Sequence, residues 1–244
     1  MIPGRPAAFG SSAIAVVAFG IAMGYLEAAV VVYLQAALGL APAGLVPAHD
    51  PAAFRAFEGV EVARELATLV MIATVGWLAG RTGLERLAWA AVVFGAWDIV
   101  YYLGLRLAIG WPPSLDTWDV LFLVPMPWVG PVWAPIVVST ALVLVGLAAT
   151  RRLRAGRPIV VGPLRAIAGL AGGALVILSF LVDSNRVLAG DSAAWTGWPV
   201  YWAGMAAATT ATMSALVGRP TAARPRGMGL HHGPDGRPPV GSPD

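Results

Sequence analysis

The chain has 244 residues, of which 58% are hydrophobic and only 12% are charged, and its formal net charge is +3. Because a soluble domain carries about 25% charged residues, this composition excludes a water-soluble globular fold and indicates an integral membrane protein. Every basic residue is arginine and cysteine is absent, which excludes disulfides, thiolate metal sites and a lysine Schiff base.

Six apolar segments have the length of about 20 residues that a helix needs to cross a bilayer. The fold class predicted from them is an all-α, polytopic membrane protein with a six-helix transmembrane domain over residues 1–217. The predicted spans cover residues 12–38, 60–79, 84–109, 131–150, 163–182 and 195–217. The first segment is longer than the apolar region of a secretory signal, so we interpret it as a retained helix.

Two stretches do not have the pattern of a span. Residues 111–130 hold a five-residue apolar core between prolines, which predicts an interfacial or re-entrant segment. Residues 218–244 are rich in proline and glycine, and this composition predicts a disordered tail. His231 and His232 lie in that tail, where a solvated dipeptide is the expected state.

The arginines predict the orientation through the positive-inside rule. With a cytoplasmic N-terminus, twelve arginines fall on the inner side and three on the outer side, and the run from Arg151 to Arg157 is the densest group. We therefore expect both termini to be cytoplasmic and the protein to lie in the cell membrane. The acidic residues show the opposite bias, because ten of the 13 lie from mid-membrane outward in this arrangement.

Three acids from three predicted spans fall at one depth. Glu27, Glu65 and Asp98 each lie 14 or 15 residues from the cytoplasmic end of their segment, or roughly 21–23 Å along a helix. Charges at this depth are expensive and persist where they face the bundle interior and have partners. The sequence therefore predicts a layer of carboxylates inside the bundle.

The second span adds a polar face to this layer. Glu61, Arg64, Glu65 and Thr68 follow one another at helical spacing, so they lie on one side of a helix. Arg64 is the predicted internal counter-ion, and the acids outnumber it. Some of them must therefore be protonated, paired elsewhere or neutralised by a bound cation.

The third span and the segment after it extend the predicted site. Asp98, Tyr102 and Arg106 recur at four-residue spacing, and we expect Arg106 to pair with Asp116 or Asp119. An alternative for Asp116 and Asp119 is a capping or interfacial role. The complete set of expected site residues is Glu27, Glu61, Arg64, Glu65, Asp98, Tyr102, Asp116 and Asp119.

Carboxylates without histidine or cysteine form an oxygen-only site, which suits Ca²⁺, Mg²⁺ or Mn²⁺, a proton, or an organic cation. The predicted metal ligands are Glu27, Glu65 and Asp98, beneath a roof formed by residues 111–130. The preferred hypothesis is transport or binding of a cation or cationic solute through an outward-facing cavity. Two alternatives stay open: a membrane enzyme acting on a lipid or polyprenyl substrate, and an assembly subunit whose acids pair with partner helices.

The expected partners are the lipid bilayer and other helices, and no nucleic acid. Gly20 with Gly24, and Gly169 with Gly173, form small-residue patterns that let helices approach closely. These two faces are the predicted sites of helix packing, of a homodimer, or of a partner subunit.

Overall fold

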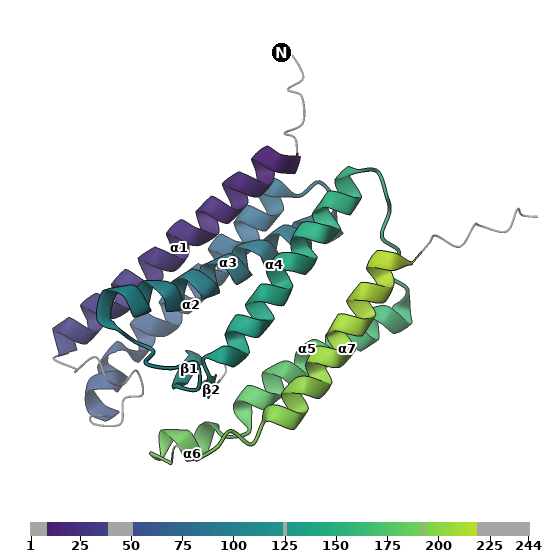
Figure 1. Ribbon diagram of the computed structural model, residues 1–244. Coiled ribbons are helices and arrows are strands. Elements are labelled where there is room, and N and C mark those ends of the chain that lie inside the picture. The colour runs from purple at the N-terminus through teal and green to yellow at the C-terminus, as the bar shows by residue number, and fades with distance from the viewer. Residues whose placement is uncertain (1–8, 39–50, 124–125, 192, 219–244) are drawn as a thin grey trace, which may run out of the picture.

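The structure is a computed structural model that describes residues 9–38, 51–123, 126–191 and 193–218. It is mostly helical, with one short hairpin between the third and fourth helices (Figure 1). The elements in chain order are α1 (Phe9–Leu38), α2 (Pro51–Ala79), α3 (Gly83–Ile109), β1 (Trp118–Phe122), β2 (Trp128–Pro131), α4 (Trp133–Arg154), α5 (Pro163–Leu181), α6 (Ser184–Leu188) and α7 (Trp198–Val217).

Local signals explain where several helices begin and end. The side chain of Thr82 accepts a hydrogen bond from the Glu85 N–H and caps α3, as a threonine at this position does. Gly110 ends the same helix with φ of 72°, a conformation that costs glycine little. Proline occupies the first turn of both α5 and α7, where its missing N–H is harmless.

Within the described residues, five helices are long and apolar enough to cross a membrane. They cover Phe9–Ala37, Gly59–Ala79, Gly83–Ile109, Trp133–Arg154 and Pro163–Val187. The predicted first five spans coincide with these helices to within a few residues. The sixth predicted span is also helical, as α7, but α7 is not among the five. The tail predicted from residue 218 onward lies almost wholly outside the described residues, as do His231 and His232.

Helix α3 is the centre of a bundle in which it packs against α1, α2 and α4. Trp89, Val92 and Val93 of α3 are fully buried in its apolar core. Gly20 and Gly24 of α1 lie directly on α3, so the first of the two predicted small-residue faces serves packing within the chain.

The segment between α3 and α4 differs from the all-α prediction, because it forms an antiparallel hairpin of β1 and β2 with Asp119 opposite Gly130. The strands are only five and four residues long. An element this short between prolines has too few positions for the two-residue alternation of a strand to show.

Helices α5 and α7 form a pair that packs mainly on itself. Gly172 and Gly204 bring the two backbones into contact. Of the two predicted glycines, Gly169 faces α7, where an added Cβ would lie 3.9 Å from the Ala211 side chain, whereas a Cβ on Gly173 would meet nothing within 4 Å. The pair joins the bundle near the hairpin, where the Tyr201 hydroxyl donates to the Ala134 carbonyl at 2.8 Å and Ser184 donates to the Pro127 carbonyl at 2.6 Å.

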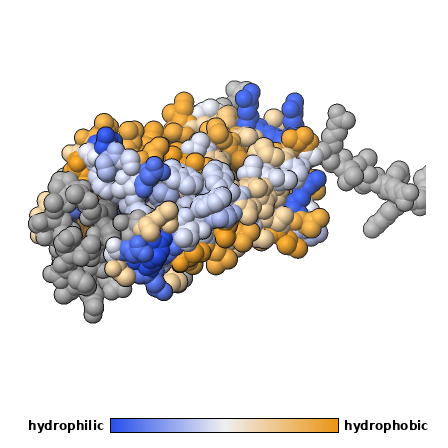
Figure 2. All heavy atoms as spheres, turned by 60° about the horizontal axis from the view of Figure 1, so that its bottom comes forward, coloured by the Kyte–Doolittle hydropathy of each residue, from blue (hydrophilic) through white to orange (hydrophobic). Residues whose placement is uncertain are grey.

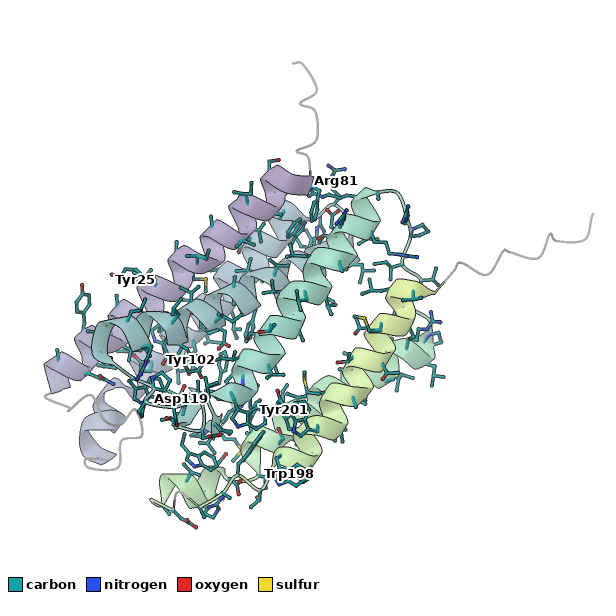
Figure 3. All side chains as sticks on the ribbon, in the orientation of Figure 1. Tyr25, Arg81, Tyr102, Asp119, Trp198 and Tyr201 are labelled. Atoms are coloured by element: carbon teal, nitrogen blue, oxygen red, sulfur yellow. The ribbon has the colours of Figure 1, made fainter. Side chains whose placement is uncertain are left out.

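The two ends of the molecule differ in chemistry. At one end Arg154 joins three elements, donating to Glu85 at 2.6 Å, to Ser12 at 2.7 Å and to the Ala79 carbonyl at 3.0 Å. Arg81 lies at that end, whereas Asp119 and Trp198 lie at the opposite end (Figure 3). Figure 2 shows hydrophobic residues along the edges of one face, residues of intermediate hydropathy across its middle, and hydrophilic residues in separate clusters. This distribution is typical of a protein whose sides contact lipid.

Candidate functional site

A small polar cavity of about 60 Å³ lies between α1, α2, α3 and β1, toward the hairpin end of the bundle. Tyr102 and Asp119 lie side by side where α3 meets the hairpin (Figure 3). The residues that line the cavity are Glu27, Arg64, Glu65, Thr68, Trp97, Asp98, Tyr101, Tyr102, Asp119, Val120, Leu121 and Phe122. The cavity therefore collects acids from three helices and one strand.

Arg64 forms the positive centre of the site. Its guanidinium pairs with Glu27 of α1 and, at 2.8 Å, with Glu61 one turn earlier in α2. Both carboxylates are largely buried, and the Arg64 side chain is 24% exposed. The arginine thus links two helices that otherwise share few contacts, as the sequence predicted for an internal counter-ion.

Glu65 connects α2 to the hairpin. Both of its carboxylate oxygens accept a hydrogen bond from the Leu123 N–H, at 2.9 and 3.1 Å. Without Glu65, the Leu123 N–H would have no acceptor beside the cavity. An unpaired backbone N–H away from water costs free energy. Glu65 therefore positions the hairpin over the cavity.

Asp98 connects α3 to α4. The Ser139 hydroxyl donates to Asp98 Oδ2 at 2.7 Å, and both side chains are buried. The close approach of the two helices comes from Gly95, whose α-carbon lies against the Ser139 carbonyl. The serine fixes one carboxylate oxygen of Asp98 in place.

Asp119 is the most deeply buried acid of the cavity, with 2% of its surface exposed. The Tyr102 hydroxyl donates to its Oδ2 at 2.8 Å, and the Val120 N–H donates to its Oδ1 at 2.9 Å. Burial raises the pKa of Asp119 to about 7, against the lowering effect of these two donors. This carboxyl therefore exchanges its proton near neutral pH.

The charges of the lining residues do not balance. Among the described residues, four lining side chains are acids, namely Glu27, Glu65, Asp98 and Asp119, and Arg64 is the only lining cation. Arg64 is also shared with Glu61. Like charges that lie near one another disfavour joint ionisation, so added positive charge, either protons or a cation, would stabilise these carboxylates.

The structure places most of the predicted site residues together and two of them elsewhere. Glu61 lies beside the cavity and reaches it through Arg64. Asp116 is exposed and does not line the cavity. The expected pairing of Arg106 with Asp116 or Asp119 is wrong, because Arg106 donates instead to the carbonyls of Gly110 and Pro112, at 2.6 and 3.0 Å.

Sequence reasoning missed three contributors to the site. Ser139 carries no charge and lies in an apolar segment, so only its buried contact with Asp98 identifies it. The Leu123 N–H belongs to the backbone and has no residue-type signal. Trp97 lines the cavity, but nothing in its sequence context distinguishes it from the other tryptophans.

The described residues contain no group of three or more histidine or acidic side chains that could hold a metal ion together. Glu27, Glu65 and Asp98 line one cavity, as their common depth predicted, without closing into such a group. No family model, no curated protein and no solved structure matches the chain.

Proposed function

We propose that the protein binds a small cation in this cavity, as a transport or solute-binding protein of the membrane. The observation that carries the proposal is the surplus of four lining acids over one arginine. A charge inside a membrane protein that is retained despite its cost points to a function for its site. A bound cation would offset the net negative charge of the described lining residues.

The size of the cavity favours an ion over an organic solute. Its volume of about 60 Å³ is far below the roughly 300–1,000 Å³ of pockets for drug-sized ligands. It is sufficient for a few water molecules, since each needs about 10–15 Å³ of such space. The carboxylates would then reach the ion partly through water, which fits a site without three direct acidic ligands.

Protons should compete with the cation. Because burial raises the pKa of Asp119 to about 7, this carboxyl gains a proton as the pH falls below neutral. The proton removes one negative charge from the cavity, so we expect cation affinity to decrease in acid. A transporter with this property would couple cation movement to proton movement.

The proposal also includes the orientation of the protein in the membrane. Both termini would be cytoplasmic, α7 would be the sixth span, and the cavity would open toward the outer side of the cell membrane. Helix α7 has 20 residues, or about 30 Å of helix, which is the thickness of the hydrocarbon core. The concentration of arginines at the opposite end from the cavity supports this arrangement.

Cation binding to the purified protein tests the function. Na⁺, Mg²⁺, Ca²⁺ and Mn²⁺ are titrated while the melting temperature is followed, because a ligand at 100 times its Kd stabilises the folded state by about 2.7 kcal/mol. We expect one of these ions to stabilise the wild type, and Glu65→Gln and Asp98→Asn to reduce the effect about tenfold or more in affinity. Asp116→Asn, at an exposed acid outside the cavity, is the matched control.

Two outcomes contradict the proposal. The first is a wild type that responds to none of the ions between about pH 6 and pH 8. The second is wild-type affinity in both cavity variants. Absence of binding together with a stoichiometric partner that co-purifies would favour the assembly-subunit hypothesis instead.

A further inference from the structure

A second and larger recess lies far from the acidic cavity, on the pair formed by α5 and α7. It has a volume of about 450 Å³. Small side chains of both helices line it, including Ala168 of α5 and Ala207 and Ala211 of α7. Most of the lining side chains are alanine, serine or threonine, so the middle of the groove has room for a flexible apolar chain.

Within residues 9–218, as far as the structure describes them, Arg165 is the single charged residue that lines this groove. It lies in the first turn of α5, at the arginine-rich end of the molecule, and donates to the Val160 carbonyl at 3.2 Å. Neither α5 nor α7 contains an acidic residue, and Arg165 has no ion pair among the parts of the chain that the structure describes. The groove thus has an apolar lining along most of its length and one arginine, Arg165, at its end.

We propose that this groove binds an anionic phospholipid, with an acyl chain along the alanines and the phosphate on Arg165. An arginine presents several N–H donors in a planar arrangement that matches phosphate oxygens. Basic recesses between membrane helices at the cytoplasmic side are suited to anionic headgroups. The site is independent of the acidic cavity and of the function proposed for it.

Charge argues against two other occupants. A second copy of the chain would bring its own Arg165 to the same groove. Residues 219–244 carry Arg219, Arg224, Arg226 and Arg237 against two acids, so that segment would bring further positive charge toward Arg165. An anionic lipid is the occupant whose charge complements the groove.

Lipid titration into the purified full-length protein tests the site. Native mass spectrometry counts bound molecules of phosphatidylglycerol and, in a parallel sample, of phosphatidylcholine with the same acyl chains. We expect phosphatidylglycerol to bind more tightly. Arg165→Gln should weaken that binding about fivefold, the change that corresponds to ~1 kcal/mol for one arginine near an anionic headgroup.

Two pairs of variants, each with one change inside the groove and one outside it, distinguish binding at this site from non-specific contact with lipid. Arg157→Gln changes an exposed arginine outside the groove and should retain the wild-type preference. Ala168→Phe fills the groove and should lower the affinity for both lipids at this site, whereas Leu170→Phe changes an exposed position of α5 that does not line it.

Three results overturn the proposal. Equal binding of the two lipids by the wild type would mean that the groove contacts only bulk lipid. A change from dimer to monomer in Ala168→Phe, with lipid binding unaltered, would assign the groove to a second copy. Phosphatidylglycerol binding that appears only after residues 219–244 are removed would assign it to that segment.

Discussion

Arg64 holds together carboxylates that would otherwise repel one another, since it pairs with Glu27 on one side and Glu61 on the other. Replacing it by alanine leaves those acids buried and unpaired, and removal of one partner of a buried ion pair costs about 3–5 kcal/mol. We expect Arg64→Ala to lower the free energy of unfolding by an amount near the lower end of this range, because the arginine is 24% exposed.

The melting temperature of the purified protein measures this effect. Arg157→Ala is the control, because Arg157 is exposed and forms no ion pair among the described residues. If Arg64→Ala and Arg157→Ala have the same melting temperature, Arg64 is solvated and does not stabilise the acids near it.

Asp119 should make stability depend on pH. Its pKa is raised from 3.8 to about 7 by burial, so the protonated carboxyl favours the folded state. This contribution is complete below about pH 4 and is lost as the pH rises toward 7. Without added cations, the wild type should therefore melt at a lower temperature at about pH 8 than at about pH 5.

Asp119→Asn removes the titrating group, so the dependence on pH between these values should become flatter. Asp116→Asn, at an exposed acid of the same segment, should retain the wild-type dependence. A wild-type melting temperature that rises over this range would contradict the predicted stabilisation by protonated Asp119.

At this scale the sequence predicted three of the acids that line the cavity, but it also predicted Asp116 there, and it did not predict what holds the lining acids in place. Glu27, Glu65 and Asp98 were found from counting residues along apolar segments, because helix rise converts a position into a depth. The partners of Glu65 and Asp98 are a backbone N–H and a serine hydroxyl. Neither group is distinctive in a sequence, so only the packed structure identifies them.

The glycines at helix contacts lead to a second prediction, about the effect of alanine substitutions on stability. A Cβ on Gly24 would overlap the backbone carbonyl oxygen of Trp97 in α3, and backbone cannot rotate away as a side chain can. We expect Gly24→Ala to destabilise the protein by about 1–3 kcal/mol, the usual cost of overpacking.

Gly173→Ala is the matched control, because a Cβ there meets nothing within 4 Å. Alanine is the better helix former by roughly 0.5–1 kcal/mol, so this variant should melt at or above the wild-type temperature. Chemical denaturation in detergent compares the two variants. Equal destabilisation would mean that Gly173 also lies in a contact, such as one with a partner helix.

The helices were predictable from the sequence and the hairpin was not, for a physical reason. A span has about 20 apolar residues, and the predicted span at residues 84–109 differs from α3 by one residue at its start. Strands β1 and β2 are stabilised by pairing with each other and by contacts such as Glu65 with Leu123. The contact of Glu65 with Leu123 joins residues 58 positions apart, which no local pattern encodes.

The orientation of the whole molecule can be tested with single cysteines, because the chain contains none of its own. Arg157→Cys is at the arginine-rich end, and Leu115→Cys is at an exposed position between α3 and the hairpin. We expect an impermeant thiol reagent to label only the second variant in intact cells. Labelling of the first alone would reverse the proposed topology.

Every described residue that lines the acidic cavity, and the serine that supports Asp98, belongs to α1–α4 or the hairpin. Helices α5 and α7 contribute none of them. A ribosome adds about 5–20 residues per second, so the roughly 60 residues from α4 to the end of α7 require about 3–12 seconds more. The site can therefore assemble while the last helices are still being translated. Its acids would then find their partners before the α5–α7 pair enters the bilayer.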